Sequence, residues 1–473
     1  MARGWLQGYP SDEVGMAQSP GSRSGRSLAE TLGAFVVRTK LADIPPETVA
    51  FTKALASKTL AGMMAGAATR AARPVMEWAR ESAGPAEAGV LGAGFRASTE
   101  VAVLANAHSA HAAELEDDQF PSATSDITVF PVVFPMVERW GISGETAVVA
   151  SAVALEVMNR IGRFSLAYRG ITDLPYFGVI GAAVAAAKGL GLDEEQVRNA
   201  IGIAVGRAGG YIANFGTDAH YFESSMASRD GYFAALMARR GLTGTTDLEK
   251  WLRQAHGRDD LPLEEIVDGL GASRWHVHNV WIKKYPCCFL THRQIDMMLA
   301  LRSRHGLVPE AVASVEVDAG PVDATCDRPA PKHVEDARFS FQHILASALT
   351  DGDVGYPSFD PARITDPDIA LLRQRIRVNL RSDWKPEFNS GIAKLTVTTR
   401  DGRTLVEERD QPLGGSRYPL TREQFLALYE KYTKGFLAPP QVRATAELVL
   451  DLEQHRDLAS LMRTITYGAA AAE

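Results

Sequence analysis

Histidine and carboxylate side chains crowd into one short segment of the sequence, between residues 108 and 118. On a helix, positions 108, 111 and 114 would share a face, and two imidazoles with one carboxylate could bind a divalent metal. The spacing matches neither the H-E-x-x-H motif nor a calcium-binding loop, so we predict no metal site. Burying several carboxylates together raises at least one pKa, which favours acid–base chemistry. The alternative to a metal or acid–base site is that these carboxylates form the acidic end of a helix that is followed by a loop. The side chains are His108, His111, Glu114, Glu116, Asp117 and Asp118.

A second segment combines two lysines with two cysteines and a histidine. Lys283 and Lys284 precede a Tyr-Pro turn and could face an anionic substrate, or they could belong to a solvated basic loop. Cys287 and Cys288 are adjacent and do not form a C-x-x-C motif. An adjacent pair of this kind is more typical of buried small residues than of a thiol nucleophile. His292 follows them. From the residues alone, both the anion-binding and the solvated interpretation stay open.

Two further histidines are candidates for moving protons. His220 lies in a glycine-containing loop from residue 215 to residue 223, and His343 begins an apolar helix. Imidazole titrates near neutrality, so either side chain could act as an acid or a base. A structural histidine is about as consistent with each position. The sequence contains no G-x-G-x-x-G, P-loop or G-x-S-x-G motif, and we therefore predict no cofactor.

Composition excludes several classes of partner. The chain has 473 residues and a formal net charge of −7, with 50 basic and 57 acidic side chains. This balance does not suggest binding to nucleic acid or to an anionic membrane surface. Apolar runs are too short to span a bilayer, and three cysteines cannot form a disulfide framework. We therefore expect a cytoplasmic protein. Residues 1–26 lack the apolar region of a signal peptide, and we expect them to form a flexible tail.

Most of the chain has helical periodicity. Apolar residues over 145–161 are spaced as in a buried helix, with Ser143 as its N-cap. Asp193 and Gln196 resemble a capping box that starts another helix. Alanines over 181–190 would let helices approach closely. These patterns predict an all-helical domain.

The pattern changes after about residue 280. Residues 312–318 alternate, with Ala313, Val315 and Val317 predicted on one face. Residues 394–408 are typical of a hairpin with an Asp401-Gly402 turn. We therefore predict a mainly α protein, with a helical domain formed by residues 27–279 and 412–473 and a smaller α/β domain inserted at residues 280–411.

Several motifs resemble those of the MmgE/PrpD family. The first is A-H-A-A-E-L-E-D-D at residues 110–118, followed by V-F-P at residues 129–131. Others are the glycine- and alanine-rich run at 178–192, K-K-Y-P-C-C-F-L-T-H at 283–292 and F-S-F-Q-H at 339–343. The family includes 2-methylcitrate dehydratase, cis-aconitate decarboxylase and iminodisuccinate epimerase. The resemblance implies a homodimer, with the α/β domain as a lid over a cleft.

The resemblance also assigns site residues, and several differ from the family pattern. Glu114 replaces the usual aspartate, Asp118 a threonine, His220 a lysine and His343 a tyrosine, whereas Lys283 is retained. Two family histidines fall on threonines, Thr124 and Thr172. The predicted catalytic residues are Glu114, Asp118, His220, Lys283 and His343, and the predicted substrate-binding residues are His111, Thr124, Thr172, Lys284 and His292.

These replacements lower the positive charge of the implied pocket. Burying unpaired carboxylates is costly, so we expect a small organic acid less anionic than 2-methylcitrate as substrate. The leading hypothesis is a cofactor-independent lyase of the dehydratase type, in bacterial biosynthesis, with His220 and His343 as base and acid and Lys283 binding the enolate or a carboxylate. A decarboxylase is also possible. The alternatives are an isomerase, epimerase or cyclising enzyme, and a non-catalytic binding protein.

Overall fold

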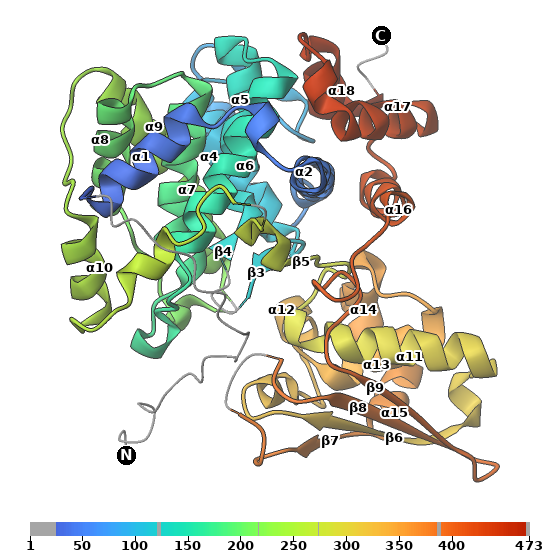
Figure 1. The fold of residues 1–473 in the computed structure, drawn as a ribbon. Coiled ribbons are helices and arrows are strands. Elements are labelled where there is room, and N and C mark those ends of the chain that lie inside the picture. The colour runs from blue at the N-terminus through green and yellow to red at the C-terminus, as the bar shows by residue number, and fades with distance from the viewer. Residues whose placement is uncertain (1–24, 121–123, 216, 273, 386–388, 470–473) are drawn as a thin grey trace.

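Two large hydrophobic cores divide the chain into a helical body and a smaller lid, and a third, smaller cluster lies within the body. The computed structural model describes residues 25–120, 124–215, 217–272, 274–385 and 389–469. The core of the body draws on residues 28–282 and 425–465, and the core of the lid on residues 285–397. Most of the predicted tail lies outside the described residues. In Figure 1 the body occupies the upper part of the molecule and the lid the lower right.

The body is a bundle of helices from both parts of the sequence. Figure 1 shows the C-terminal helices beside α2, and α16 and α17 both contact α2. The helices are α1 (Leu28–Arg38), α2 (Pro46–Gly66), α3 (Arg73–Glu81), α4 (Thr99–Ala112), α5 (Phe130–Trp140), α6 (Gly144–Ile161), α7 (Asp173–Gly189), α8 (Glu194–Val205), α9 (Asp218–Arg239), α10 (Leu248–His256), α16 (Arg422–Thr433), α17 (Pro439–Leu450) and α18 (Ala459–Tyr467).

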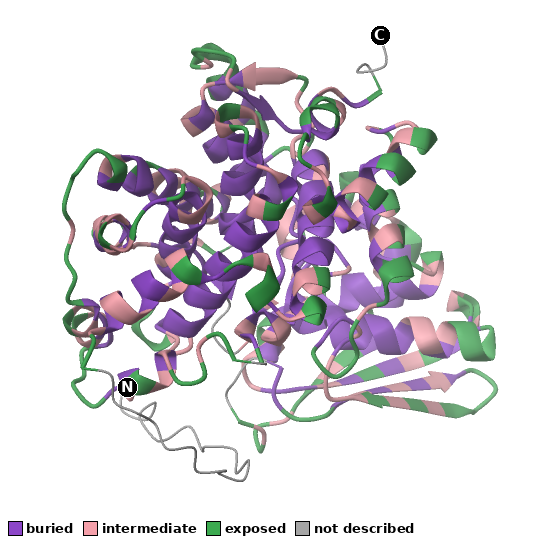
Figure 2. Cartoon of the chain, turned by 45° about the horizontal axis from the view of Figure 1, so that its top comes forward, coloured by how far each residue is buried: buried purple, intermediate pink, exposed green. Residues whose placement is uncertain are grey.

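Predicted caps and small residues explain the central helices. Ser143 accepts a hydrogen bond from Thr146 N at the start of α6, and Asp193 and Gln196 form a capping box at the start of α8. Gly231 of α9 lies so close to α7 that a Cβ atom would be 2.4 Å from Val179 O. Figure 2 shows the central helices almost entirely buried. None of the helices among the described residues is long and apolar enough to cross a membrane.

The lid is an α/β unit built on a four-stranded sheet. Its strand order is β7-β6-β8-β9, and only the β6–β7 pair is parallel. The predicted hairpin is confirmed, with Gly402 in its turn at φ +88°. The elements are β6 (Val312–Ala319), β7 (Ile376–Leu380), β8 (Ala393–Thr399), β9 (Thr404–Arg409), α11 (His292–His305), α12 (Val334–Ala337), α13 (Phe341–Asp351), α14 (Pro361–Ile364) and α15 (Pro367–Arg373).

One predicted strand face is corrected at its first residues. A register shift in the β6–β8 pairing between Val312 and Ser314 leaves Ala313 exposed and Val312 buried. Bulges of this kind change which side chain faces the core. Val315 and Val317 are buried as predicted.

Short strands join the segments that carry the candidate residues. β3 (Asp118–Gln119) lies between β4 (Thr124–Ser125) and β5 (Val280–Trp281), and Asp118 is opposite Trp281. This pairing brings the acidic segment next to the Lys283 segment, although more than 160 residues separate them. A separate hairpin, β1 (Ala88–Val90) with β2 (Phe95–Ala97), lies on the body.

Candidate active site

Lys283 lies among carboxylates where the body meets the lid. Its ammonium group is 2.9 Å from Glu114 Oε2 and also donates to Glu116 Oε1. All three side chains are buried. Two of the three ammonium N–H groups are used in this way, which leaves one without a partner among the described residues. The arrangement is an anion-binding cation held by two carboxylates, and it favours the anion-binding interpretation of this segment over the solvated one.

Glu114 has an unusual backbone conformation. Helix α4 ends at Ala112, and Glu114 is buried at φ +54°, in the left-handed region. The expectation that positions 108, 111 and 114 share a helix face is therefore wrong, because the helix ends before residue 114. His108 instead hydrogen-bonds Ala71 O at 3.0 Å. A non-glycine residue held at positive φ is uncommon and often marks a functional position.

The carboxylates around Lys283 have pKa values shifted in opposite directions. Burial opposes the charge on Glu114, but Lys283 and Arg338 lower its pKa to about 2. Burial and the Glu116 carboxylate raise the pKa of Asp118 well above its usual range. Burial and the charge of Glu114 also raise the pKa of Glu116. One ammonium group cannot fully compensate three carboxylates, so the ionised form is favoured at Glu114 and the protonated form is favoured at Glu116 and Asp118. Such pairs are typical of acid–base sites.

A second ion pair stabilises the segment after α4 that carries Glu114 and Glu116. Lys58 of α2 binds Asp117 Oδ1 at 2.5 Å and also donates to Leu115 O. The same Asp117 oxygen accepts the Lys283 backbone N–H at 2.8 Å. Asp126 accepts from Asp117 N at 3.1 Å and Thr59 Oγ1 at 2.5 Å. These contacts fix the backbone on both sides of Glu116.

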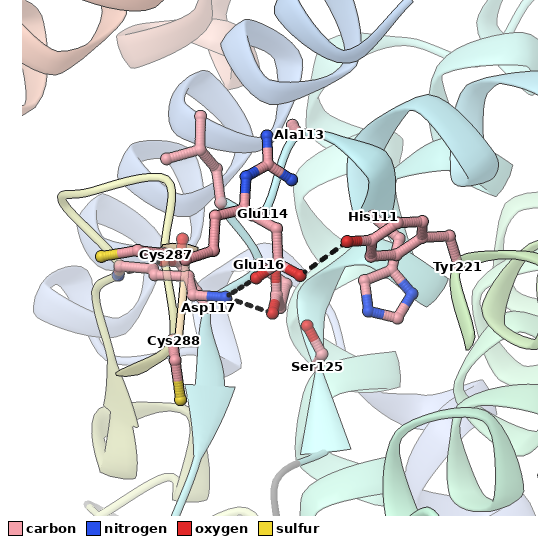
Figure 3. Close-up of polar contacts among 12 residues, drawn as sticks. His111, Ala113, Glu114, Glu116, Asp117, Ser125, Tyr221, Cys287 and Cys288 are labelled. Atoms are coloured by element: carbon pink, nitrogen blue, oxygen red, sulfur yellow. Dashed lines mark hydrogen bonds and ion pairs between the residues drawn. The ribbon is translucent and has the colours of Figure 1, made fainter. Parts of the chain in front are cut away.

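Helix α9 adds a tyrosine and a histidine to the cluster. Tyr221 donates to Glu114 Oε1 at 3.0 Å, as Figure 3 shows, and lies 2.7 Å from Glu335 Oε2 of the lid. Burial, Glu114 and Glu335 raise the pKa of Tyr221 well above its usual value, so its hydroxyl keeps its proton. The His220 ring is 4.5 Å from the His111 ring, centroid to centroid.

His111 is a neutral imidazole in this site. Its Nδ1 contacts Ser224 Oγ at 2.9 Å. Burial, followed by the charges of His220 and Lys283, lowers the pKa of His111 well below its usual value. The neutral ring can exchange a proton or hydrogen-bond to a ligand.

Buried polar atoms without a hydrogen-bond partner gather in this region. Among the described residues they include Glu116 Oε2, Asp118 Oδ1, His111 Nε2 and both ring nitrogens of His292. His292 stacks on Phe289, with its pKa lowered well below the usual value by burial and by Lys283. Buried polar atoms nearly always have partners, so this concentration indicates where a polar ligand would bind.

Three other predicted residues have partners outside the Lys283 cluster, and within the described part of the chain a fourth has an unpartnered hydroxyl. His343 contacts Ser358 O at 2.7 Å and Arg373 Nη1 at 3.2 Å, both within the lid. Lys284 binds Asp296 at 2.6 Å. Thr124 Oγ1 donates to Asn159 Oδ1 at 2.9 Å. Thr172 is buried at the start of α7, and its hydroxyl has no partner among the described residues.

Three residues of the cluster were missed by the sequence reasoning. Tyr221 directly follows His220, but nothing in its spacing singles it out. Glu335 and Arg338 precede the F-S-F-Q-H motif, and the charge pattern alone is typical of an exposed helix. Only the closing of the lid on the body brings them to Glu114.

A cavity of about 650 Å³ lies elsewhere on the body, and none of the predicted residues lines it. Its lining includes Arg96, Glu138, Arg456 and Arg463. The Lys283 cluster remains the candidate site because three acidic side chains gather around one cation there, beside polar atoms that are unpartnered among the described residues.

The buried Asp173, which follows Thr172, should make the stability of the protein depend on pH. Burial raises its pKa to about 7, although Ser165 and Leu166 N donate to the carboxylate. The folded state therefore binds a proton that the unfolded state releases, and stability falls as pH rises from about 4 to 7. We expect the free energy of unfolding of Asp173→Asn to exceed that of the wild type by up to about 4 kcal/mol at pH 8 and by little at pH 4.

Thermal unfolding of the wild type and of Asp173→Asn at a series of pH values tests this expectation. The exposed Asp259 provides a control, since Asp259→Asn should leave the pH dependence unchanged. Parallel stability curves for Asp173→Asn and the wild type would contradict the assignment.

Comparison with known proteins agrees with the motifs and the fold. Residues 30–252 match the MmgE/PrpD N-terminal domain and residues 285–454 match the MmgE/PrpD C-terminal domain. Human cis-aconitate decarboxylase is 24% identical over 469 residues, which cover 95% of this chain and 96% of the human protein. The mouse cis-aconitate decarboxylase is 27% identical over 398 residues, 78% of this chain and 79% of the mouse protein. The cis-aconitate decarboxylase of Aspergillus terreus is 25% identical over 462 residues, 89% of this chain and 92% of the fungal protein.

The matched domains together span most of the chain between residues 30 and 454 and include the acidic segment and the lid core, and Lys283 lies just before the start of the second match. The resemblance suggested by the motifs is confirmed. This chain is a divergent member of the MmgE/PrpD family.

Proposed function

We propose that this protein is a cofactor-independent lyase that removes water from a hydroxy acid. The observation that carries the proposal is the pairing of Glu114 with Asp118 around Lys283. The pKa of Glu114 is lowered to about 2 and that of Asp118 is raised well above its usual range, and these opposed shifts favour the ionised form that a base needs and the protonated form that an acid needs for an elimination. Family membership and the cis-aconitate decarboxylase relatives support a lyase.

In the proposed reaction the Glu114 carboxylate takes the proton from the carbon next to a substrate carboxylate. The electrons of that C–H bond form the new C=C bond while the C–O bond to the neighbouring hydroxyl breaks. Asp118 gives its proton to the departing oxygen, and water is released. The Lys283 ammonium stabilises the negative charge that develops on the substrate carboxylate. His220, beside His111 and Tyr221, is the second candidate for the base.

Charge in the cluster supports a substrate with few carboxylates. Glu114, Glu116 and Asp118 surround one ammonium group, and Thr124 and Thr172 stand where the family has histidines. A tricarboxylate would bring three negative charges to a cluster in which the Lys283 ammonium is already paired with Glu114 and Glu116. We therefore propose a hydroxy acid less anionic than 2-methylcitrate.

Decarboxylation is the second candidate, because the curated relatives are cis-aconitate decarboxylases. In that reaction the carbon–carbon bond to a carboxylate breaks, carbon dioxide leaves, and an acid protonates the remaining carbanion. Asp118 or Tyr221 could supply this proton, and Lys283 would hold a second carboxylate. His343 is not needed in either scheme because its ring nitrogens bond within the lid.

The deciding experiment is NMR of an acid panel incubated with the protein in D2O. The panel contains cis-aconitate, 2-methylcitrate, malate and simple β-hydroxy acids. We expect an alkene to form from a mono- or dicarboxylic hydroxy acid. Carbon dioxide release from cis-aconitate would establish the second candidate instead. Deuterium uptake without loss of water would indicate an isomerase or epimerase, and no change in any acid would favour the non-catalytic alternative.

The homodimer belongs to the same proposal and rests on the resemblance, whereas the proposed cytoplasmic location rests on the presence of only three cysteines in the sequence. Light scattering tests the dimer, since a mass near 51 kDa would contradict it.

A further inference from the structure

Arg338 is a buried cation of the lid that lacks a close carboxylate partner. It directly follows α12, and 5% of the residue is exposed. Its backbone oxygen accepts the Cys288 N–H at 3.0 Å, which ties it to the Lys283 segment. Among the described residues its Nε atom has no partner. Burying a guanidinium group in this state is costly, so its presence calls for an explanation.

Glu335 is the carboxylate nearest to this guanidinium group, and the pairing is loose. Arg338 Nη1 is 3.5 Å from Glu335 Oε2, whereas a charged hydrogen bond of this type is normally shorter than about 3 Å. The same Glu335 oxygen lies 2.7 Å from the Tyr221 hydroxyl. Glu335 is only partly buried and lies at the edge of the cluster, so its side chain can turn outward without breaking a core.

The Tyr221 hydroxyl has two carboxylate acceptors but one proton. Glu114 Oε1 lies 3.0 Å away and Glu335 Oε2 2.7 Å away. The hydroxyl can donate to only one of them at a time. Glu114 is fully enclosed and also holds Lys283, so Glu335 is the more replaceable partner.

We infer that Arg338 and Tyr221 form a subsite for a substrate carboxylate, and that the Glu335 carboxylate fills it until substrate displaces it. The inference rests on the proposed function for the reaction and adds the lid residues that select the substrate. A bound carboxylate would pair with the guanidinium fork of Arg338 and accept the Tyr221 proton. The negative charge of Glu335 is then exchanged for that of the substrate, so the balance of charge in the site is preserved.

Calorimetric binding of succinate tests the subsite without any turnover, because succinate has no hydroxyl group to eliminate. We expect Glu335→Gln to bind succinate about tenfold more tightly than the wild type, since an internal competitor is removed. Arg338→Gln should bind it at least about tenfold more weakly, the loss expected for a charged hydrogen bond. Glu310→Gln, an exposed lid residue, is the matched control and should bind as the wild type does. Succinamide, which has no charge, should not bind.

Weaker binding by Glu335→Gln would overturn the inference, because Glu335 would then support Arg338 and not compete with substrate. Absence of succinate binding by both the wild type and Glu335→Gln at millimolar concentration would overturn it as well. If Arg338→Gln does not fold, Arg338→Lys replaces it in the test, because lysine keeps the positive charge but cannot form two parallel hydrogen bonds to a carboxylate. Unchanged succinate affinity in Arg338→Lys would also overturn the inference. Binding with the expected order but no turnover of any acid would instead refute the proposed function alone.

Discussion

We expect replacement of Lys283 with methionine to lower turnover by at least about 100-fold, because in the proposed reaction the negative charge that develops on the substrate would lose its cation. The same substitution should also lower the stability of the protein, because Lys283 pairs with two buried glutamates. Glu114 and Glu116 would be left buried without their shared ammonium group, and removing one partner of a buried pair costs about 3–5 kcal/mol. Steady-state kinetics on the active acid of the panel and chemical denaturation measure the two effects separately.

The stability loss in Lys283→Met should depend on pH in a defined direction. Without the ammonium group, burial raises the pKa of both glutamates above their unfolded values. The folded state then binds the additional protons, so the loss is small at low pH and grows as pH rises above about 4. A loss that does not vary with pH would contradict the assignment of uncompensated carboxylates.

Two further variants separate the role in catalysis from the role in folding. Lys53 is also a buried lysine and binds Glu453 at 2.7 Å, away from the cluster. Lys53→Met should lose stability but keep turnover. Lys283→Arg keeps the positive charge in a different geometry, so it should remain folded and lose turnover. Full activity in Lys283→Arg or Lys283→Met would remove this residue from the mechanism.

We expect replacement of Glu114 with glutamine to lower kcat by about 100- to 10,000-fold, the range typical of the loss of a general base, which is the role proposed for Glu114. The side chain keeps its shape and its hydrogen bond from Tyr221, and Lys283 retains Glu116. We therefore expect a folded protein that binds ligand but exchanges no substrate proton with D2O. NMR of deuterium uptake measures this step directly.

Glu156→Gln is the matched control for this prediction. Glu156 is a fully buried glutamate of α6 that pairs with Arg160, outside the cluster. Its variant should keep wild-type proton exchange. Normal exchange in Glu114→Gln would transfer the role of base to another group, and His220→Asn would then be the variant to examine.

The pH profile of the wild type should show the opposed pKa shifts. Glu114 is ionised above about pH 2, so it does not limit activity in the ordinary acidic range. Asp118 must be protonated to act as the acid, so we expect activity to fall as pH rises through its raised pKa. Activity that rises with pH through neutrality would contradict Asp118 as the acid.

Local patterns in the sequence were sufficient for much of the fold. The buried spacing and caps of α6 and α8, and the Asp401-Gly402 hairpin, depend on residues close together in the chain. Hydrophobic periodicity records such local preferences directly. The motifs likewise identified Lys283 and Glu114, which the structure brings together at 2.9 Å.

The end of α4 and the start of β6 could not be read from periodicity. Glu114 follows the end of α4 at positive φ, and a bulge at the start of β6 turns Ala313 toward solvent. Both features arise where backbone geometry is set by neighbouring segments, and alternating or helical spacing in the sequence is insensitive to them.

What the sequence by itself determined is therefore the mainly α architecture with an α/β lid, the family, and the lysine and glutamate at the centre of the candidate site. Only the tertiary structure decided that His343 bonds within the lid and that Tyr221 contacts Glu335. It also decided that Arg338 is buried beside them. The physical reason is the range of the interactions: periodicity and turns act over a few residues, whereas these contacts form only when two cores built from distant segments pack together.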